Sequence, residues 1–256
     1  MFSLNCYDED EGTPIAKFMN KRKSTLLCIS KDGESSDSDD DKLKYVQLAS
    51  GKFEPRMNPY QRNVNYIAGP SGSGKTHYAV ALAKAYLKMF DVPFFVFSRT
   101  DYRKDPAFKG MKPIQIDINE SLLTDPIDIT QELTGGSLVL FDDCNTIQDD
   151  KLLKVVEKLI ADILEIGRKE NINILYTSHL VIPNNKKAAR TIMNELQTVT
   201  VFPKSGSAQQ IRYALKTYFG LDNKQIDRII QTKSRWVTVS KSYPMYVLSE
   251  KEAYIL

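Results

Sequence analysis

An eight-residue loop rich in glycine constrains this chain more than any other feature of its sequence. The loop matches the pattern G-x-x-x-x-G-K-[ST] and consists of Gly69, Pro70, Ser71, Gly72, Ser73, Gly74, Lys75 and Thr76. The pattern of residues 63–68, just before the loop, predicts a strand, and the pattern of residues 75–90 predicts a helix. In that context the loop backbone curls its N–H groups around phosphates, and the helix N-terminus adds positive charge. We therefore predict a nucleoside triphosphate site, with ATP as the ligand.

The end of this loop and a downstream acidic pair supply the chemistry of the site. Lys75 is predicted to reach the β- and γ-phosphate oxygens, and the Thr76 hydroxyl is predicted to coordinate Mg²⁺. The apolar segment 137–141 predicts a buried strand that leads into Asp142 and Asp143. Asp142 is expected to hold Mg²⁺, and Asp143 to orient or deprotonate the attacking water. The alternative for Asp143 is that it only caps the next turn.

Polar residues also end a second buried segment, residues 172–177. Ligands in open α/β sheets bind at the carboxyl ends of strands. Ser178 and His179 are therefore candidates for contacting the γ-phosphate or the attacking water, and a purely structural cap is the alternative. The other histidine, His77, is predicted to face out of the first helical turn.

An arginine lies between the predicted helix at residues 150–167 and the strand at 172–177. We expect Arg168 to lie at the sheet edge, where an arginine can reach the nucleotide of a neighbouring subunit as an arginine finger. A surface arginine without a catalytic role is the alternative. Arg99 and Arg103, which follow the second strand, are rivals for the same role.

Strands and helices alternate from residue 63 onward. The clearest strands are predicted at residues 63–68, 93–98, 114–118, 137–141 and 172–177. Such alternation predicts an α/β fold, here a P-loop NTPase built as a three-layer α/β/α sandwich with a mainly parallel central sheet.

The first 57 residues differ from the rest in their charge composition. They are predicted to form an acidic, partly disordered extension to an ATPase domain at residues 58–256. Acidic clusters occupy residues 8–11 and 34–41, and a basic patch occupies residues 21–23. The serine-rich acidic run at 33–41 cannot build a core and predicts a mobile loop. Short strands are predicted on either side of it, at residues 25–30 and 43–48.

The charge distribution and the cysteine content indicate which partners and which cellular compartment the sequence favours. From residue 181 to the end there are 12 Lys and Arg against 5 Asp and Glu, which is compatible with a polyanionic partner or with a solvated surface. Cys6, Cys28 and Cys144 are scattered and odd in number, which favours a reducing compartment and argues against a disulfide framework. No apolar run predicts a membrane-spanning segment, and no secretion signal is recognised at the N-terminus.

These features together, in this order, resemble the poxvirus-type DNA-packaging ATPases of large DNA viruses and virophages, within the FtsK/HerA superfamily. The resemblance covers roughly residue 58 to the C-terminus. It rests on the loop at 69–76, on residues 138–143 with their double aspartate, on Gly167 with Arg168, and on the polar strand end at 176–179. The spacing of 67 residues between Lys75 and Asp142 adds to its specificity.

The resemblance implies ATP hydrolysis coupled to translocation of double-stranded DNA, in a homo-oligomeric ring that receives Arg168 in trans. It also implies capsid proteins as partners, and a location in the host cytoplasm at the virus factory and in the virion. Basic residues after the polar strand end are candidates for gripping DNA phosphates: Lys186, Lys187, Arg190, Lys204 and Arg212.

The sequence departs from the family pattern at two positions. His179 stands where the family usually has glutamine, and Lys169 follows the arginine where histidine is common. Two alternative functions also share a phosphate-binding loop. One is a nucleoside or nucleotide kinase, for which the double aspartate is unusual and no Arg-rich lid is apparent. The other is a nucleotide-gated scaffold protein that recruits partners through the acidic arm.

Overall fold

Contacts within the fold divide the chain into two units that are not consecutive segments of sequence. Residues 62–196 form one unit, and residues 1–61 together with 197–256 form the other. The computed structural model describes residues 1–30, 43–183 and 185–256, so the acidic run at 33–41 lies outside the described residues. The division at residues 57 and 58 into an extension and an ATPase domain stays a prediction.

Five parallel strands form the sheet of the unit at residues 62–196. They are β6 (Val64–Ala68), β7 (Phe94–Ser98), β8 (Ile114–Asp117), β9 (Leu138–Phe141) and β10 (Asn173–Ser178). Their order across the sheet is β6-β10-β9-β7-β8. Every residue of β6, β7, β9 and β10 is buried, as expected for parallel strands covered on both faces. All five predicted strands are present, to within a residue at each end.

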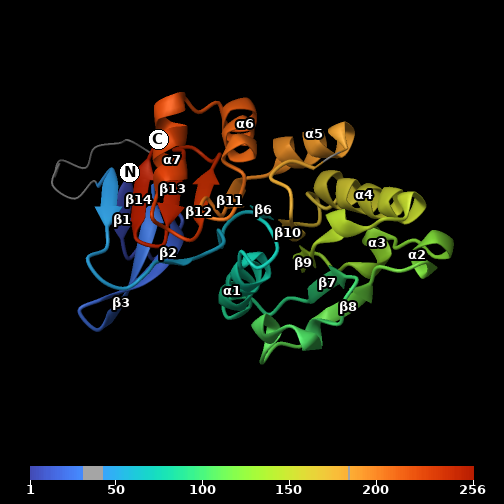
Figure 1. The fold of residues 1–256 in the computed structure, drawn as a ribbon. Helices are drawn as coiled ribbons and strands as arrows, with labels where there is room; N and C mark the ends of the chain where they lie inside the picture. Colours follow the sequence, from blue (N-terminus) through green and yellow to red (C-terminus); the bar gives the residue numbers. More distant parts are fainter. Residues whose placement is uncertain (31–42, 184) are drawn as a thin grey trace. The chain divides into compact units, whose positions relative to one another are not determined.

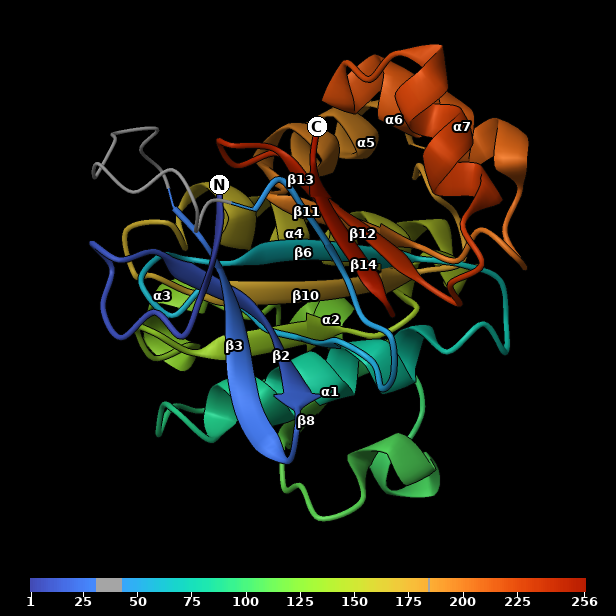
Figure 2. The same ribbon diagram turned by 90° about the vertical axis from the view of Figure 1, so that its left-hand side faces the viewer.

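Helices cover both faces of this sheet, as Figures 1 and 2 show. Helix α1 (Lys75–Leu87) packs on β6 and β10, and α4 (Asp150–Glu165) and α5 (Lys186–Glu195) lie on the other face. Shorter elements connect the strands: η2 (Tyr102–Lys104), η3 (Pro106–Phe108), α2 (Ser121–Thr124), α3 (Ile129–Glu132) and η4 (Cys144–Thr146). The mixed α/β fold with its mostly parallel sheet confirms the predicted fold class.

Local sequence explains where helix α4 begins and ends. Asp149 caps its N-terminus by accepting a hydrogen bond from the backbone N–H of Leu152. At the other end, Arg62 donates hydrogen bonds to the carbonyl oxygens of Ile163 and Leu164, which satisfies part of the last turn. Gly167 follows where a Cβ atom would lie 2.4 Å from the carbonyl oxygen of Ile163. The glycine of the Gly-Arg motif is therefore required for packing.

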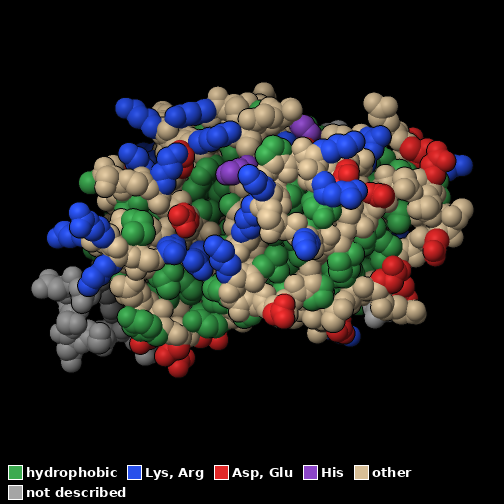
Figure 3. Space-filling model, turned by 90° about the horizontal axis from the view of Figure 1, so that it is seen from below, with side chains coloured by type: hydrophobic (Ala, Val, Ile, Leu, Met, Phe, Trp, Pro, Cys, Tyr) green, Lys and Arg blue, Asp and Glu red, His purple; other side chains and the backbone are tan. Residues whose placement is uncertain are grey.

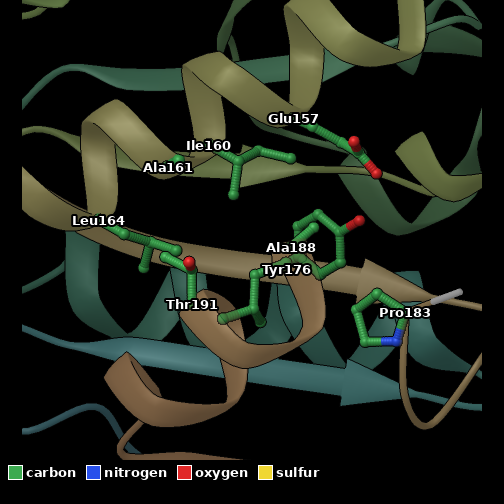
Figure 4. A pocket seen from close by; sticks show the side chains of 9 residues that line it. Glu157, Ile160, Ala161, Leu164, Tyr176, Pro183, Ala188 and Thr191 are labelled. Carbon is green, nitrogen blue, oxygen red and sulfur yellow. The ribbon is translucent and has the colours of Figure 1, made fainter. Parts of the chain in front are cut away.

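Helices α4 and α5 and strand β10 line a small, mainly apolar pocket of about 20 Å³. Figure 4 shows the hydroxyl of Tyr176 and the carboxylate of Glu157 pointing toward the same side of it. The Tyr176 ring stacks on Tyr66 with ring centroids 5.2 Å apart. Burial raises the pKa of the Tyr176 hydroxyl well above its ordinary value. That hydroxyl makes no hydrogen bond to any residue within the described ranges.

The other unit contains two antiparallel sheets and two helices. The first sheet has the order β1-β3-β2-β5, with β1 (Phe2–Leu4), β2 (Thr13–Asn20), β3 (Lys23–Ile29) and β5 (Glu54–Pro55). The second contains, in order, β4 (Tyr45–Gln47), β14 (Glu252–Ile255), β13 (Tyr246–Ser249), β12 (Val237–Ser240) and β11 (Thr198–Val201). Helices α6 (Ala208–Phe219) and α7 (Asn223–Gln231) complete this unit. Among the described residues, no helix combines the length and apolar character needed to cross a membrane.

The cysteines correct one expectation from the sequence. Cys6 and Cys28 form a disulfide, with Cα atoms 6.1 Å apart, so the argument against a disulfide framework is wrong for these two. Cys6 follows β1 and Cys28 lies in β3, and the antiparallel pairing of these strands brings the two residues together. Cys144 is free and buried, and burial raises the pKa of its thiol well above the ordinary value.

Candidate nucleotide-hydrolysis site

The phosphate-binding loop connects β6 to α1 in a conformation that depends on glycine. Gly72 and Gly74 have φ angles of 74° and 106°, which side chains rarely permit. Gly74 is the N-cap of α1, and neither a side-chain cap nor an acidic residue occupies the first turn of that helix. Lys75, only 5% exposed, folds back so that its Nζ lies 3.5 Å from the carbonyl oxygen of Pro70. The helix N-terminus therefore presents its positive charge with no acidic residue in its first turn.

Two oxygen ligands for a metal ion meet beside this loop. The Thr76 hydroxyl donates a hydrogen bond to Asp142 Oδ1 across 3.1 Å. Burial raises the pKa of Asp142, and its hydrogen bond from Thr177 opposes that rise. Hydroxyl and carboxylate oxygens suit Mg²⁺. The described residues hold no group of three or more His, Cys, Asp or Glu side chains able to bind a metal. Mg²⁺ would therefore need phosphate oxygens and waters as its remaining ligands.

The Asp143 carboxylate contacts a lysine and a histidine. Its Oδ1 is 3.5 Å from Lys75 Nζ, and its Oδ2 is 3.0 Å from His179 Nε2. The backbone of Asp143 is in the left-handed region, with φ 49° and ψ 36°, and its side chain makes no capping hydrogen bond to η4. The capping alternative is therefore not observed. A strained backbone that directs a carboxylate toward the phosphate-binding lysine is characteristic of a functional site.

Strand β10 joins the two aspartates through a residue to which the sequence pattern gave no role of its own. Thr177 is fully buried, and its hydroxyl donates to Asp142 Oδ1 across 2.9 Å. The same hydroxyl accepts a hydrogen bond from the backbone N–H of Asp143, also at 2.9 Å. Thr177 thus positions the Asp142 carboxylate and also the backbone of Asp143, which sets the direction of the Asp143 side chain.

The other polar residues at this strand end divide into structural and site residues. Ser178 is fully buried, and its carbonyl oxygen accepts a hydrogen bond from the backbone N–H of Gly69. Its hydroxyl accepts one from Leu180, so Ser178 ties the loop to β10. His179 reaches Asp143, and its backbone N–H donates to Asn145 Oδ1 across 3.3 Å. Asn145 was missed because nothing in the sequence distinguishes it from an ordinary loop residue.

Arg168 lies just before β10, at the amino end of a strand whose carboxyl end carries the site. Its side chain is exposed and pairs with no residue that the structure describes. Arg99, at the carboxyl end of β7, donates a hydrogen bond to the carbonyl oxygen of Thr146. Arg103 forms an ion pair with Asp101. Of the three arginines, Arg168 is the one that no residue within the described ranges engages.

The remaining candidates have mixed placements. His77 is exposed on the first turn of α1, as predicted. Lys187, Arg190 and Lys204 are exposed, and the Lys186 side chain lies outside the described part of the chain. Arg212 is engaged by Asp227 at 2.6 Å, which reduces its availability for phosphates.

This fold and site define a P-loop NTPase. The fold is similar to that of the genome-packaging NTPase B204 from Sulfolobus turreted icosahedral virus 2, solved in complex with AMPPCP. The TM-score is 0.51 at 10% identity, over 75% of this chain and 99% of that chain. It is also similar to the conjugation coupling protein TcpA of pCW3, solved with ATPγS. There the TM-score is 0.50 at 12% identity, over 94% of this chain and 77% of that chain.

The sequence places the chain in a viral family. It is 44% identical over 223 residues to a Sputnik virophage protein, "Uncharacterized protein V3", with 87% of this chain and 88% of that protein covered. The chain therefore belongs to the family of that virophage protein. No protein-family model matches it. The predicted resemblance to viral packaging ATPases is confirmed at the level of the fold, which is that of a viral genome-packaging NTPase.

Proposed function

We propose that this protein is a viral DNA-packaging ATPase that hydrolyses ATP to translocate double-stranded DNA into a capsid. The observation that carries the hydrolytic part is the position of Asp143. Its carboxylate lies 3.5 Å from Lys75 Nζ and 3.0 Å from His179 Nε2. A carboxylate beside the phosphate-binding lysine is where a water that attacks the γ-phosphate needs a proton acceptor. The fold shared with a genome-packaging NTPase supports the DNA-packaging part.

The residues of the site divide the reaction among them. Lys75 neutralises phosphate oxygens, and Asp143 orients the attacking water and accepts its proton. The water oxygen forms a bond to the γ-phosphorus while the bond to the β–γ bridging oxygen breaks, and ADP leaves with that electron pair. Thr76 and Asp142 would hold Mg²⁺, which neutralises charge on the phosphates when it is bound. His179 holds Oδ2 of the Asp143 carboxylate, whereas Lys75 contacts Oδ1.

The amino-end position of Arg168 supports an assembly of several subunits. In a parallel sheet the phosphate-binding loop follows the carboxyl end of its strand, so Arg168 lies at the edge opposite its own ATP site. Because its side chain is exposed and unengaged by described residues, it is suited to stabilise the transition state of a neighbouring subunit. A homo-oligomeric ring would give every site such an arginine.

The packaging role also requires contacts with DNA and with capsid proteins. The DNA would be gripped through its phosphates, with Lys187 and Arg190 on α5 and Lys204 as exposed candidates. Capsid proteins would be the docking partners. The working location would be the host cytoplasm at the virus factory, and the virion.

A DNA-stimulated ATPase assay tests the proposal, with two variants that separate binding from chemistry. Asp143→Asn keeps the side-chain size and should lower hydrolysis by about 10²- to 10⁴-fold, because the proton acceptor is removed. It should still bind ATP, whereas Lys75→Ala should lose binding. Hydrolysis that ignores duplex DNA even at low salt would contradict the packaging role. Phosphate transfer to a nucleoside instead of water would establish the kinase alternative, and tight ATP binding without turnover would establish the scaffold alternative.

A further inference from the structure

The β2–β3 hairpin extends beyond the strands that flank it. The two strands pair from Thr13 opposite Ile29 to Asn20 opposite Lys23. On one side, β5 pairs only with residues 16 and 17 of β2, and on the other, β1 pairs only with residues 27–29 of β3. The outer part of the hairpin is therefore a two-stranded ribbon, seen in Figures 1 and 2.

Two basic residues form the turn at the tip of this ribbon. Lys21 and Arg22 both have positive φ angles, 45° and 72°. Two-residue hairpin turns with two such angles normally use Asn-Gly, because other residues are strained there. A long cationic side chain at each position has no local structural advantage. Strain retained at an exposed turn indicates a role for the side chains themselves.

Positive charge is concentrated at this tip and has no ion-pair partner among the described residues. Lys21, Arg22 and Lys23 are exposed, and none of the three pairs with a residue that the structure describes. No Asp or Glu occurs from residue 12 to residue 30. The acidic cluster at 8–11 precedes β2, whose eight residues span about 26 Å. That length is about three times the Debye length at physiological salt, so the acidic cluster does not screen the tip.

The base of the hairpin is held firmly. The disulfide between Cys6 and Cys28 joins β3 to the segment after β1. Nearer the tip, Phe18 of β2 packs edge-to-face on Phe53 with ring centroids 5.3 Å apart. The cationic tip is therefore carried on a fixed support within its own unit.

We propose that the tip of the β2–β3 hairpin, residues Lys21–Lys23, binds the phosphate backbone of double-stranded DNA. This inference rests on the proposed packaging function and adds a DNA contact outside the candidates named from the sequence pattern. A two-stranded ribbon fits the major groove of B-DNA, and lysine and arginine bind phosphates without reading sequence, which translocation requires. Lys and Arg side chains are prominent on the face shown in Figure 3.

A charge-removal variant that preserves the hairpin tests the proposal. The variant carries Lys21→Asn, Arg22→Gly and Lys23→Gln, so the turn becomes the favoured Asn-Gly pair. The matched control removes the same charge from exposed positions of the same unit, through Lys224→Gln, Lys233→Gln and Lys251→Gln. Binding of a labelled 30-base-pair duplex to the full chain is measured by fluorescence anisotropy over a range of salt concentrations. Basal ATP hydrolysis should be unchanged in both variants.

The expected result is that DNA binding by the tip variant depends less on salt concentration than binding by the wild type. Each lost phosphate contact reduces the slope of log K against log salt by about 0.9, so the tip variant should lose about 2 to 3 and the control less than 1. Equal slopes in the two variants, with the wild type still binding, would overturn the hairpin proposal and leave the packaging function standing. A wild type that binds no duplex at low salt would overturn both. If polyglutamate of equal charge displaces the labelled duplex as effectively as unlabelled duplex does, the tip binds polyanions in general, and the proposal that it binds DNA is overturned.

Discussion

Replacing Thr177 by valine tests whether the buried hydroxyl on β10 organises the carboxylates of Asp142 and Asp143. Valine has nearly the same shape, so the change removes the hydrogen bonds of the hydroxyl and creates no cavity. The hydroxyl lies 2.9 Å from Asp142 Oδ1 and 2.9 Å from the backbone nitrogen of Asp143. Loss of a hydrogen bond to a charged group costs about 1.5–3 kcal/mol, and an unsatisfied buried N–H costs about 1–3 kcal/mol. The free energy of unfolding should therefore fall by roughly 3–5 kcal/mol.

Activity should fall further than stability alone explains. Without Thr177, the Asp142 carboxylate and the strained backbone of Asp143 lose their common anchor. A displacement of about 1 Å in a catalytic group lowers the rate by about 100-fold. Steady-state ATP hydrolysis should show this loss mainly in kcat, because the phosphate-binding loop keeps its own contacts. Urea unfolding monitored by circular dichroism gives the stability change.

Thr200→Val is the matched control for this substitution. Thr200 is 1% exposed on β11, and its hydroxyl shares one 2.8 Å hydrogen bond with the hydroxyl of Thr238. Its loss should cost about 1–2 kcal/mol and leave ATP hydrolysis unchanged. The reasoning is refuted if the Thr177 variant hydrolyses ATP within about threefold of wild type, or if it loses no more stability than the control.

Three further predictions concern packing and charge. Gly167→Ala should lower the free energy of unfolding by about 1–3 kcal/mol, because its Cβ would lie 2.4 Å from the carbonyl oxygen of Ile163; unchanged urea unfolding would contradict this. Tyr176→Phe should be neutral within about 0.5 kcal/mol, whereas Tyr66→Phe should cost about 1 kcal/mol because it loses a 2.7 Å hydrogen bond; equal costs would refute the contrast. Burial raises the pKa of Glu250, but hydrogen bonds to its carboxylate outweigh this and hold the pKa below its ordinary 4.5. The stability it contributes is therefore present above pH 4.5 and lost as the pH falls through the lower folded value, so wild type and Glu250→Gln should converge in unfolding free energy on acidification.

Much of the parallel unit was predictable because its signals are local. The segments 94–98 and 138–141 are continuous apolar runs that only a strand buried on both faces accommodates. Gly72 and Gly74 occupy positions that need positive φ, so the loop motif encodes its own backbone shape. The burial of Lys75 against Pro70 follows from the same motif. These features depend on neighbours within a few residues.

The N-terminal strands and the disulfide were harder to predict because their partners are distant in sequence. Cys6 and Cys28 are 22 residues apart and meet only through strand pairing. Strand β4 pairs with β14, about 200 residues later, so its short segment carries little signal of its own. The charge pattern that separated residues 1–57 from the rest reflects solvation, whereas the contacts group residues 1–61 with 197–256.

The sequence by itself determined the phosphate-binding loop, the acidic pair and the polar strand end, because each is a local pattern of residue types. Only the tertiary structure decided how they meet. Strand β10 is last in sequence among the five parallel strands but lies between β6 and β9. Its backbone hydrogen bonds to both neighbours bring Thr177 against Asp142, and His179 against Asp143. Strand order depends on how whole faces pack, and no short motif encodes it.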